Sequence, residues 1–145
     1  MCLPSFLGDP LQNRTVLIVE DDAASVDIFS TILRHGGYQV LAAHTASDGA
    51  RVAREHVPDL VVVDLGLPDT PGFGLLDELT DDPITAHIPL IVCTVHVFEH
   101  DEHRARRAGG DLFLHKPIEP SELLRHVDQL LRSPPAPTPA EELSS

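Results

Sequence analysis

Five short apolar runs constrain the fold of this chain more than any other feature of its sequence. The runs span Thr15–Val19, Tyr38–Ala42, Leu60–Val63, Leu90–Cys93 and Leu112–Leu114. The first stops abruptly at an acidic cluster, and the third stops at Asp64. Continuous runs of this length, rich in β-branched residues, are typical of strands that are covered on both faces of a parallel sheet. The sequence therefore predicts five buried strands.

Segments with helical character separate these runs. After the first strand, apolar residues from Val26 to Leu33 recur at helical spacing, and the segment ends at Gly36-Gly37, a pair suited to a left-handed helix terminus. Further helices are expected at Ser47–His56, Phe73–Leu79 and Glu99–Ala108, and a last one from Pro120 through Leu131 with Glu119 as its N-cap. Five strands alternating with five helices predict an α/β fold with a doubly wound parallel sheet.

The length of 145 residues predicts a single domain. We expect it to span residues 14–132, after a leader at residues 1–13 that lacks periodicity and before a disordered, proline-rich tail at residues 133–145. The leader does not resemble a signal peptide, and no apolar stretch is long enough to span a membrane. Cys2 and Cys93 are expected to be unpaired thiols, which indicates a reducing cytoplasm.

The formal charge of −13 argues against nucleic acid or an anionic membrane surface as a partner. The arginines at positions 104, 106 and 107 lie among acidic residues and are expected to offset those charges instead of binding nucleic acid. The same region contains histidines at positions 96, 100 and 103. Histidines at this spacing are compatible with a transition-metal site, but an exposed, charged helix is the favoured interpretation.

The predicted sheet brings a chemically coherent set of polar residues to one edge, because the carboxyl ends of parallel strands meet there. The set comprises Glu20, Asp21, Asp64, Thr94 and Lys116, with Asp22 as its weakest member because it directly precedes a helix and is suited to capping it. Crowded carboxylates repel one another unless a hard divalent cation such as Mg²⁺ neutralises them. An aspartate in such a site can attack phosphorus, while the lysine ammonium and threonine hydroxyl hold phosphoryl oxygens.

Five sequence motifs, which include these site residues, resemble those of a known protein family. They are Leu17-Ile18-Val19-Glu20-Asp21-Asp22, Val62-Val63-Asp64-Leu65-Gly66-Leu67-Pro68, Pro71-Gly72-Phe73, Cys93-Thr94 and His115-Lys116-Pro117. In this order and at this spacing, the motifs resemble the signature of response-regulator receiver domains over about residues 14–132. The resemblance implies a flavodoxin-like sheet with strand order 2-1-3-4-5.

The resemblance also implies roles for individual residues. Asp64 is expected to be the phospho-acceptor, and Mg²⁺ is expected to be bound by Asp64, by Asp21 directly, by Glu20 through water and by the backbone carbonyl of Gly66. Lys116 would pair with the phosphoryl group. Thr94 and Phe113 would move together on activation and change the surface of the fourth helix and fifth strand. Val95 is larger than usual after the threonine, and Gly66 and His96 occupy variable positions that influence phosphoryl access.

The main interpretation is a stand-alone receiver that catalyses only its own aspartyl phosphorylation and dephosphorylation. A histidine kinase or histidine phosphotransfer protein would donate the phosphoryl group, and a downstream protein would read the changed surface. A phosphorelay intermediate or phosphate sink remains an alternative, as does a phosphorylation-independent scaffold. An enzyme acting on a free substrate is less favoured, because Gly66 stands where other aspartyl-phosphate enzymes typically have a second acid.

Overall fold

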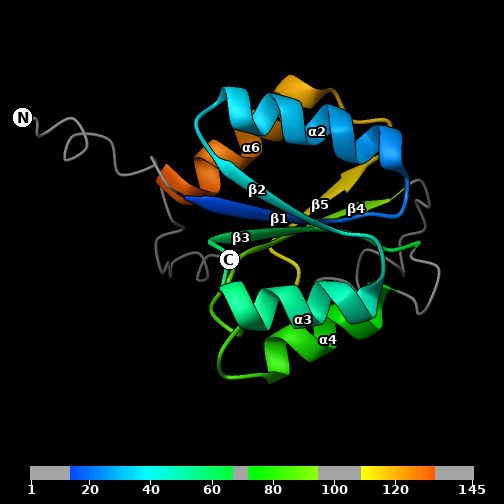
Figure 1. The fold of residues 1–145 in the computed structure, drawn as a ribbon, viewed down its shortest axis with the longest axis vertical. Helices are drawn as coiled ribbons and strands as arrows, with labels where there is room; N and C mark the ends of the chain where they lie inside the picture. Colours follow the sequence, from blue (N-terminus) through cyan, green and yellow to red (C-terminus); the bar gives the residue numbers. More distant parts are fainter. Residues whose placement is uncertain (1–13, 67–71, 95–108, 133–145) are drawn as a thin grey trace, which may run out of the picture.

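The computed structural model describes residues 14–66, 72–94 and 109–132, and in them the chain forms a five-stranded parallel sheet (Figure 1). Its elements are β1 (Thr15–Val19), α2 (Ala23–His35), β2 (Gln39–Ala43), α3 (Ala46–His56), β3 (Leu60–Asp64), α4 (Gly72–Asp81), β4 (Leu90–Thr94), β5 (Leu112–His115) and α6 (Pro120–Arg132). The strand order is β2-β1-β3-β4-β5, which confirms the expected order 2-1-3-4-5.

Four of the five expected helices lie within the described residues. The helix expected at Glu99–Ala108, the leader at residues 1–13 and the tail at residues 133–145 lie outside them. None of the described helices is long and apolar enough to cross a bilayer.

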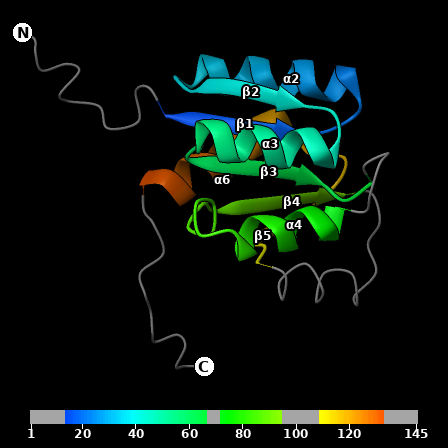
Figure 2. The ribbon, with the colours of Figure 1, turned by 60° about the horizontal axis from the view of Figure 1, so that its bottom comes forward.

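Helices cover both faces of the sheet. Helices α2 and α6 lie on one face, and α3 and α4 lie on the other (Figures 1 and 2). Alternate strand residues accordingly enter two separate cores: Leu17 and Val19 pack with the α3 and α4 side, whereas Val16 and Ile18 pack with the α2 and α6 side. This division explains why the central strands are apolar without alternation, since both faces of each are buried.

The loop after β1 and the end of α2 are fixed by capping. Asp22 is the N-cap of α2, and its carboxylate accepts a hydrogen bond from the Ser25 backbone N–H at 3.2 Å. At the other end, Gly37 adopts a left-handed conformation with φ of 100°, and the Tyr38 N–H donates to the Leu33 carbonyl at 3.0 Å. Both features agree with the sequence prediction.

Several strand boundaries were predicted one residue too early: β3, β4 and β5 each end one residue later than expected, and β2 is displaced by one residue at both ends. The strand expected at Tyr38–Ala42 spans Gln39–Ala43. The Tyr38 N–H is used in the helix cap, as described above, so the ladder with β1 begins at the pair Thr15 and Gln39.

Two aspartates clamp the opposite, amino-terminal edge of the sheet. The Asp59 carboxylate accepts a hydrogen bond from the Thr15 N–H at 2.8 Å, and the Asp59 N–H donates to the Thr15 carbonyl at 2.8 Å. Asp111 and Leu90 make the same reciprocal pair, with both bonds 2.8 Å long. These clamps set the start of neighbouring strands and thereby contribute to the alignment of their carboxyl ends.

Candidate functional site

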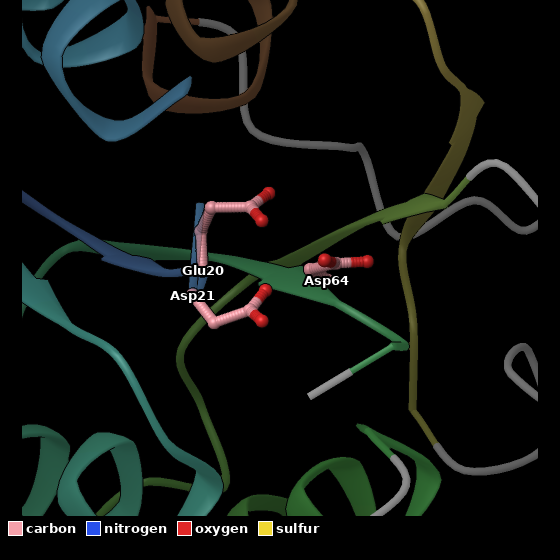
Figure 3. A group of neighbouring side chains, drawn as sticks. All are labelled: Glu20, Asp21 and Asp64. Atoms are coloured by element: carbon pink, nitrogen blue, oxygen red, sulfur yellow. The ribbon is translucent and has the colours of Figure 1, made fainter. Parts of the chain in front are cut away.

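Three carboxylates gather where two neighbouring central strands end. Glu20 and Asp21 follow β1, and Asp64 is the last residue of β3 (Figure 3). One ligand oxygen from each residue lies within 4.8 Å of the others. The arrangement follows from the parallel register, in which Val19 and Val63 are partners and the residues after them meet at the same edge. The structure thus brings these three predicted site residues together.

Glu20 is the most deeply buried member of this group, with 4% of its surface exposed. Its Oε1 accepts a hydrogen bond from Lys116 Nζ at 2.5 Å, and its Oε2 accepts one from the Asp22 backbone N–H at 3.2 Å. Burial raises the pKa of the Glu20 carboxyl; the bond from Lys116 opposes this shift, and the charge on Asp64 adds to it. Burial therefore disfavours the charged form of this carboxyl.

The two oxygens of Asp64 have different surroundings. Oδ1 accepts a hydrogen bond from the Gly66 backbone N–H at 3.1 Å, whereas Oδ2 lies 3.5 Å from Lys116 Nζ. The side chain is 12% exposed, so it is accessible from solvent although its neighbours hold it. Gly66 was predicted to contribute its carbonyl; the contact observed here is made by its N–H, and the role of the carbonyl stays a prediction.

Lys116 bridges two of the three carboxylates. Burial of its ammonium alone would lower the pKa of Lys116, but the hydrogen bond to Glu20 and the charges on Asp64 and Glu20 outweigh burial and raise it. Lys116 is the only lysine in the sequence, and it sits 16% exposed at this site. Its ammonium is therefore charged at neutral pH and already directed at Asp64.

The predicted switch residues lie on the two strands beside the cluster. Thr94 ends β4 with no exposed surface, and its carbonyl accepts a hydrogen bond from the Lys116 N–H at 2.8 Å. Phe113 on β5 is partly buried against the core on the α3 and α4 side. Its ring meets the His115 ring edge-on, with centroids 5.3 Å apart and planes at 83°. Thr94 thus connects directly to the Lys116 backbone, whereas Phe113 belongs to the adjoining core.

The contact of His44 near the cluster was not anticipated from sequence, whereas Cys93 was expected as an unpaired thiol in a buried strand. His44, which directly follows β2, places its Nδ1 3.2 Å from the Glu20 carbonyl oxygen. Cys93 is buried beneath the site as a register partner of Asp64, and burial raises the pKa of its thiol to about 12. A detectable signal existed for His44, because β2 and β1 are parallel neighbours and the residues that follow them lie side by side. Val95 and the histidines at positions 96, 100 and 103 lie outside the described residues.

The donor set fits a hard divalent cation. It consists of carboxylate oxygens, including one that is almost fully buried and whose charge burial penalises. Mg²⁺ prefers oxygen ligands, is commonly held by one or two carboxylates and retains waters that fill the remaining positions. A doubly charged cation would also relieve the repulsion among the three acids.

Comparisons with known proteins agree with this arrangement. Residues 16–128 match the family described as "Response regulator receiver domain". The polar-differentiation response regulator DivK of Brucella ovis is 30% identical over 118 residues, which cover 81% of this chain and 96% of that protein.

Solved structures show the same fold. A CheY-like response regulator receiver domain protein from Methanospirillum hungatei superposes with a TM-score of 0.79 at 29% identity, covering 83% of this chain and 95% of that one. The receiver domain of the sensor histidine kinase PA1611 from Pseudomonas aeruginosa, with a magnesium ion coordinated in its active-site cleft, has a TM-score of 0.77 at 25% identity, covering 83% and 99% of the two chains. The present chain therefore belongs to the response regulator receiver domain family.

Proposed function

We propose that this receiver domain accepts a phosphoryl group on Asp64 in a Mg²⁺-dependent reaction and signals through the resulting change in its surface. The observation that carries this proposal is the position of Lys116, whose ammonium lies 3.5 Å from Asp64 Oδ2 and 2.5 Å from Glu20 Oε1. An ammonium directed at the acceptor carboxylate, with further acids beside it, suits phosphoryl transfer because that reaction depends on positioning and charge neutralisation.

Asp64, Asp21, Glu20 and the backbone carbonyl of Gly66 would hold the ion. When bound, Mg²⁺ would neutralise charge on the phosphoryl oxygens and on the carboxylates. In the transfer step, a carboxylate oxygen of Asp64 attacks phosphorus and forms a P–O bond. The P–N bond to a donor histidine breaks at the same time, and its electron pair returns to the imidazole. Lys116 and the Thr94 hydroxyl would then hold phosphoryl oxygens.

The proposed donor is a histidine kinase or a histidine phosphotransfer protein, and the proposed reader is a downstream protein in the cytoplasm. Thr94 and Phe113 would report the phosphorylated state to that protein. The tie between the Thr94 carbonyl and the Lys116 N–H supports this proposal, because it joins the end of β4 to the residue that would bind the phosphoryl group. The chemistry would be confined to phosphorylation and dephosphorylation of the protein's own aspartate.

The proposal is tested by phosphorylation with acetyl phosphate, read as retardation on a phosphate-affinity gel. Wild type should shift with Mg²⁺ and should not shift with a chelator, and Asp64→Asn should not shift in either condition. Asp77→Asn is the matched control, because Asp77 is an exposed aspartate on α4 away from the cluster, and it should behave as wild type.

Beryllofluoride provides a second readout that does not need a reactive donor. Chemical-shift changes at the site with Mg²⁺ and beryllofluoride would support the phospho-acceptor even if acetyl phosphate reacts slowly. Neither a gel shift nor a beryllofluoride response would refute the proposal and favour a phosphorylation-independent scaffold. Return of label from Asp64 to a phosphotransfer protein would identify a relay intermediate instead of a terminal signalling protein.

A further inference from the structure

The backbone of Glu20 is held by two contacts from the strand beside it. Its N–H donates to the Ala43 carbonyl at 2.9 Å, and its carbonyl lies 3.2 Å from His44 Nδ1. The registered pairing of β1 with β2 ends one residue earlier, at Val19 and Ala43. The imidazole therefore extends the ladder by one contact beyond the strands, just before Thr45 caps the next helix.

This contact determines which nitrogen of the His44 ring carries a proton. A carbonyl oxygen only accepts hydrogen bonds, so Nδ1 must carry the proton, and in the neutral ring Nε2 is the acceptor. His44 is exposed, so burial does not confine its ring. Among the residues that the structure describes, its contact with the Glu20 carbonyl is the one that orients the ring.

The orientation of the Glu20 carbonyl affects the position of the next residue, Asp21. The carbonyl belongs to the peptide unit that joins Glu20 to Asp21, so its direction sets the orientation of the Asp21 nitrogen and α-carbon. The two residues differ in how their side chains are held: Glu20 is buried against Lys116, whereas Asp21 is exposed. Backbone orientation therefore matters most for Asp21. On the far side of the loop, Asp22 is anchored by capping α2.

We infer that His44 is a positioning residue for the magnesium site: by donating from Nδ1 to the Glu20 carbonyl, it fixes the peptide that carries Asp21 without touching the ion. The inference rests on the proposed function, because it concerns the same cluster. It differs from a direct ligand role, since the ring nitrogen that faces the loop is used on a backbone oxygen.

The test is Mg²⁺ affinity, measured by two-dimensional NMR titration at a pH where imidazole is neutral. His44→Ala should weaken binding about fivefold, which corresponds to about 1 kcal/mol. His44→Asn should bind within about twofold of wild type, because its side-chain N–H₂ stands the same number of bonds from Cβ as Nδ1 and can replace that donor. His56→Ala removes an exposed histidine from the end of α3 and should leave Mg²⁺ affinity unchanged.

The outcomes separate this inference from the proposal on which it rests. Weakened binding in His44→Ala with recovery in His44→Asn supports the positioning role, since a loss of general stability would not be rescued by a donor alone. Wild-type affinity in His44→Ala, or equal weakening in both His44 variants, would overturn the inference and leave the metal site intact. Failure of wild type to bind Mg²⁺ would overturn the metal assignment and this inference together.

Discussion

Replacing Lys116 with methionine should destabilise the metal-free protein, because it removes the one ammonium that separates the clustered acids. Methionine keeps most of the unbranched side chain, so the change is mainly one of charge. In the native protein the ammonium lies 2.5 Å from Glu20 Oε1 and 3.5 Å from Asp64 Oδ2. Without it, Glu20 is left buried beside another carboxylate, and no opposing charge contacts it among the described residues.

The magnitude follows from burial and distance. Unit charges 3.5 Å apart attract by about 5 kcal/mol at an effective dielectric constant of about 20, and the cost of burying the ammonium offsets part of this. Removal of one partner from a buried pair typically costs about 3–5 kcal/mol. Lys116 is 16% exposed, and Glu20 can take up a proton in the variant. We therefore expect a loss near the lower limit, about 3 kcal/mol.

Urea unfolding followed by far-ultraviolet circular dichroism, in chelator and in Mg²⁺, measures this loss. Mg²⁺ should stabilise Lys116→Met more than wild type, because the variant lacks the ammonium that repels the ion. Arg125→Met is the control, since its contact with Glu122 is more than half exposed on both sides and should contribute little. Equal free energies of unfolding for Lys116→Met and wild type in chelator, or equal gains from Mg²⁺, would refute this account of the site.

Three further expectations concern the core, the pH dependence and the coupling of the site. Gly49→Ala would place a methyl group 2.9 Å from both γ-carbons of Val19, so the free energy of unfolding should fall by about 1–3 kcal/mol; an unchanged midpoint in urea would mean that Val19 yields at no cost. Burial raises the pKa of Glu20, so its contribution to stability is greatest below the ordinary glutamate pKa of about 4.3 and is lost as pH rises through the raised value. In chelator, the free energy of unfolding of Glu20→Gln should therefore increase relative to that of wild type as pH rises through this window. A difference between the two proteins that stays constant or falls with pH would contradict a raised pKa for Glu20. Lys116→Ala should accept some phosphate on Asp64 yet show little spectral change at Phe113. Spectral changes as large as those of wild type would mean that Lys116 does not couple phosphorylation to Phe113.

The sequence predicted the sheet well because its strands depend on local composition. Runs such as Leu60–Val63 are short, rich in β-branched residues and apolar on both faces, as expected for strands that are buried in a sheet covered on both sides. The carboxyl ends of those strands then placed Glu20, Asp21 and Asp64 together, and the structure confirms their proximity. The start of β2 was missed by one residue because the cap of α2, a contact outside the strand itself, decides it.

Contacts between residues distant in sequence could not be predicted in the same way. The clamp between Asp59 and Thr15 joins residues 44 positions apart, and the bond from His44 to Glu20 joins residues 24 positions apart. Neither produces a periodic pattern, and an aspartate or histidine at a strand end is equally compatible with solvent exposure. The predicted strand order would have placed His44 beside the residues that follow β1, because β1 and β2 are parallel neighbours.

The position of Lys116 suggests how a charge change at Asp64 could reach the rest of the sheet. Its ammonium contacts Glu20 more closely than Asp64, at 2.5 Å and 3.5 Å, respectively. Under the proposed function, a phosphoryl group on Asp64 would add negative charge and draw the ammonium away from Glu20. The Lys116 backbone is tied to Thr94 by a 2.8 Å hydrogen bond, so a change in its side chain acts where β4 and β5 end. The same lysine would thus balance the acidic cluster before phosphorylation and link it to the switch residues afterwards.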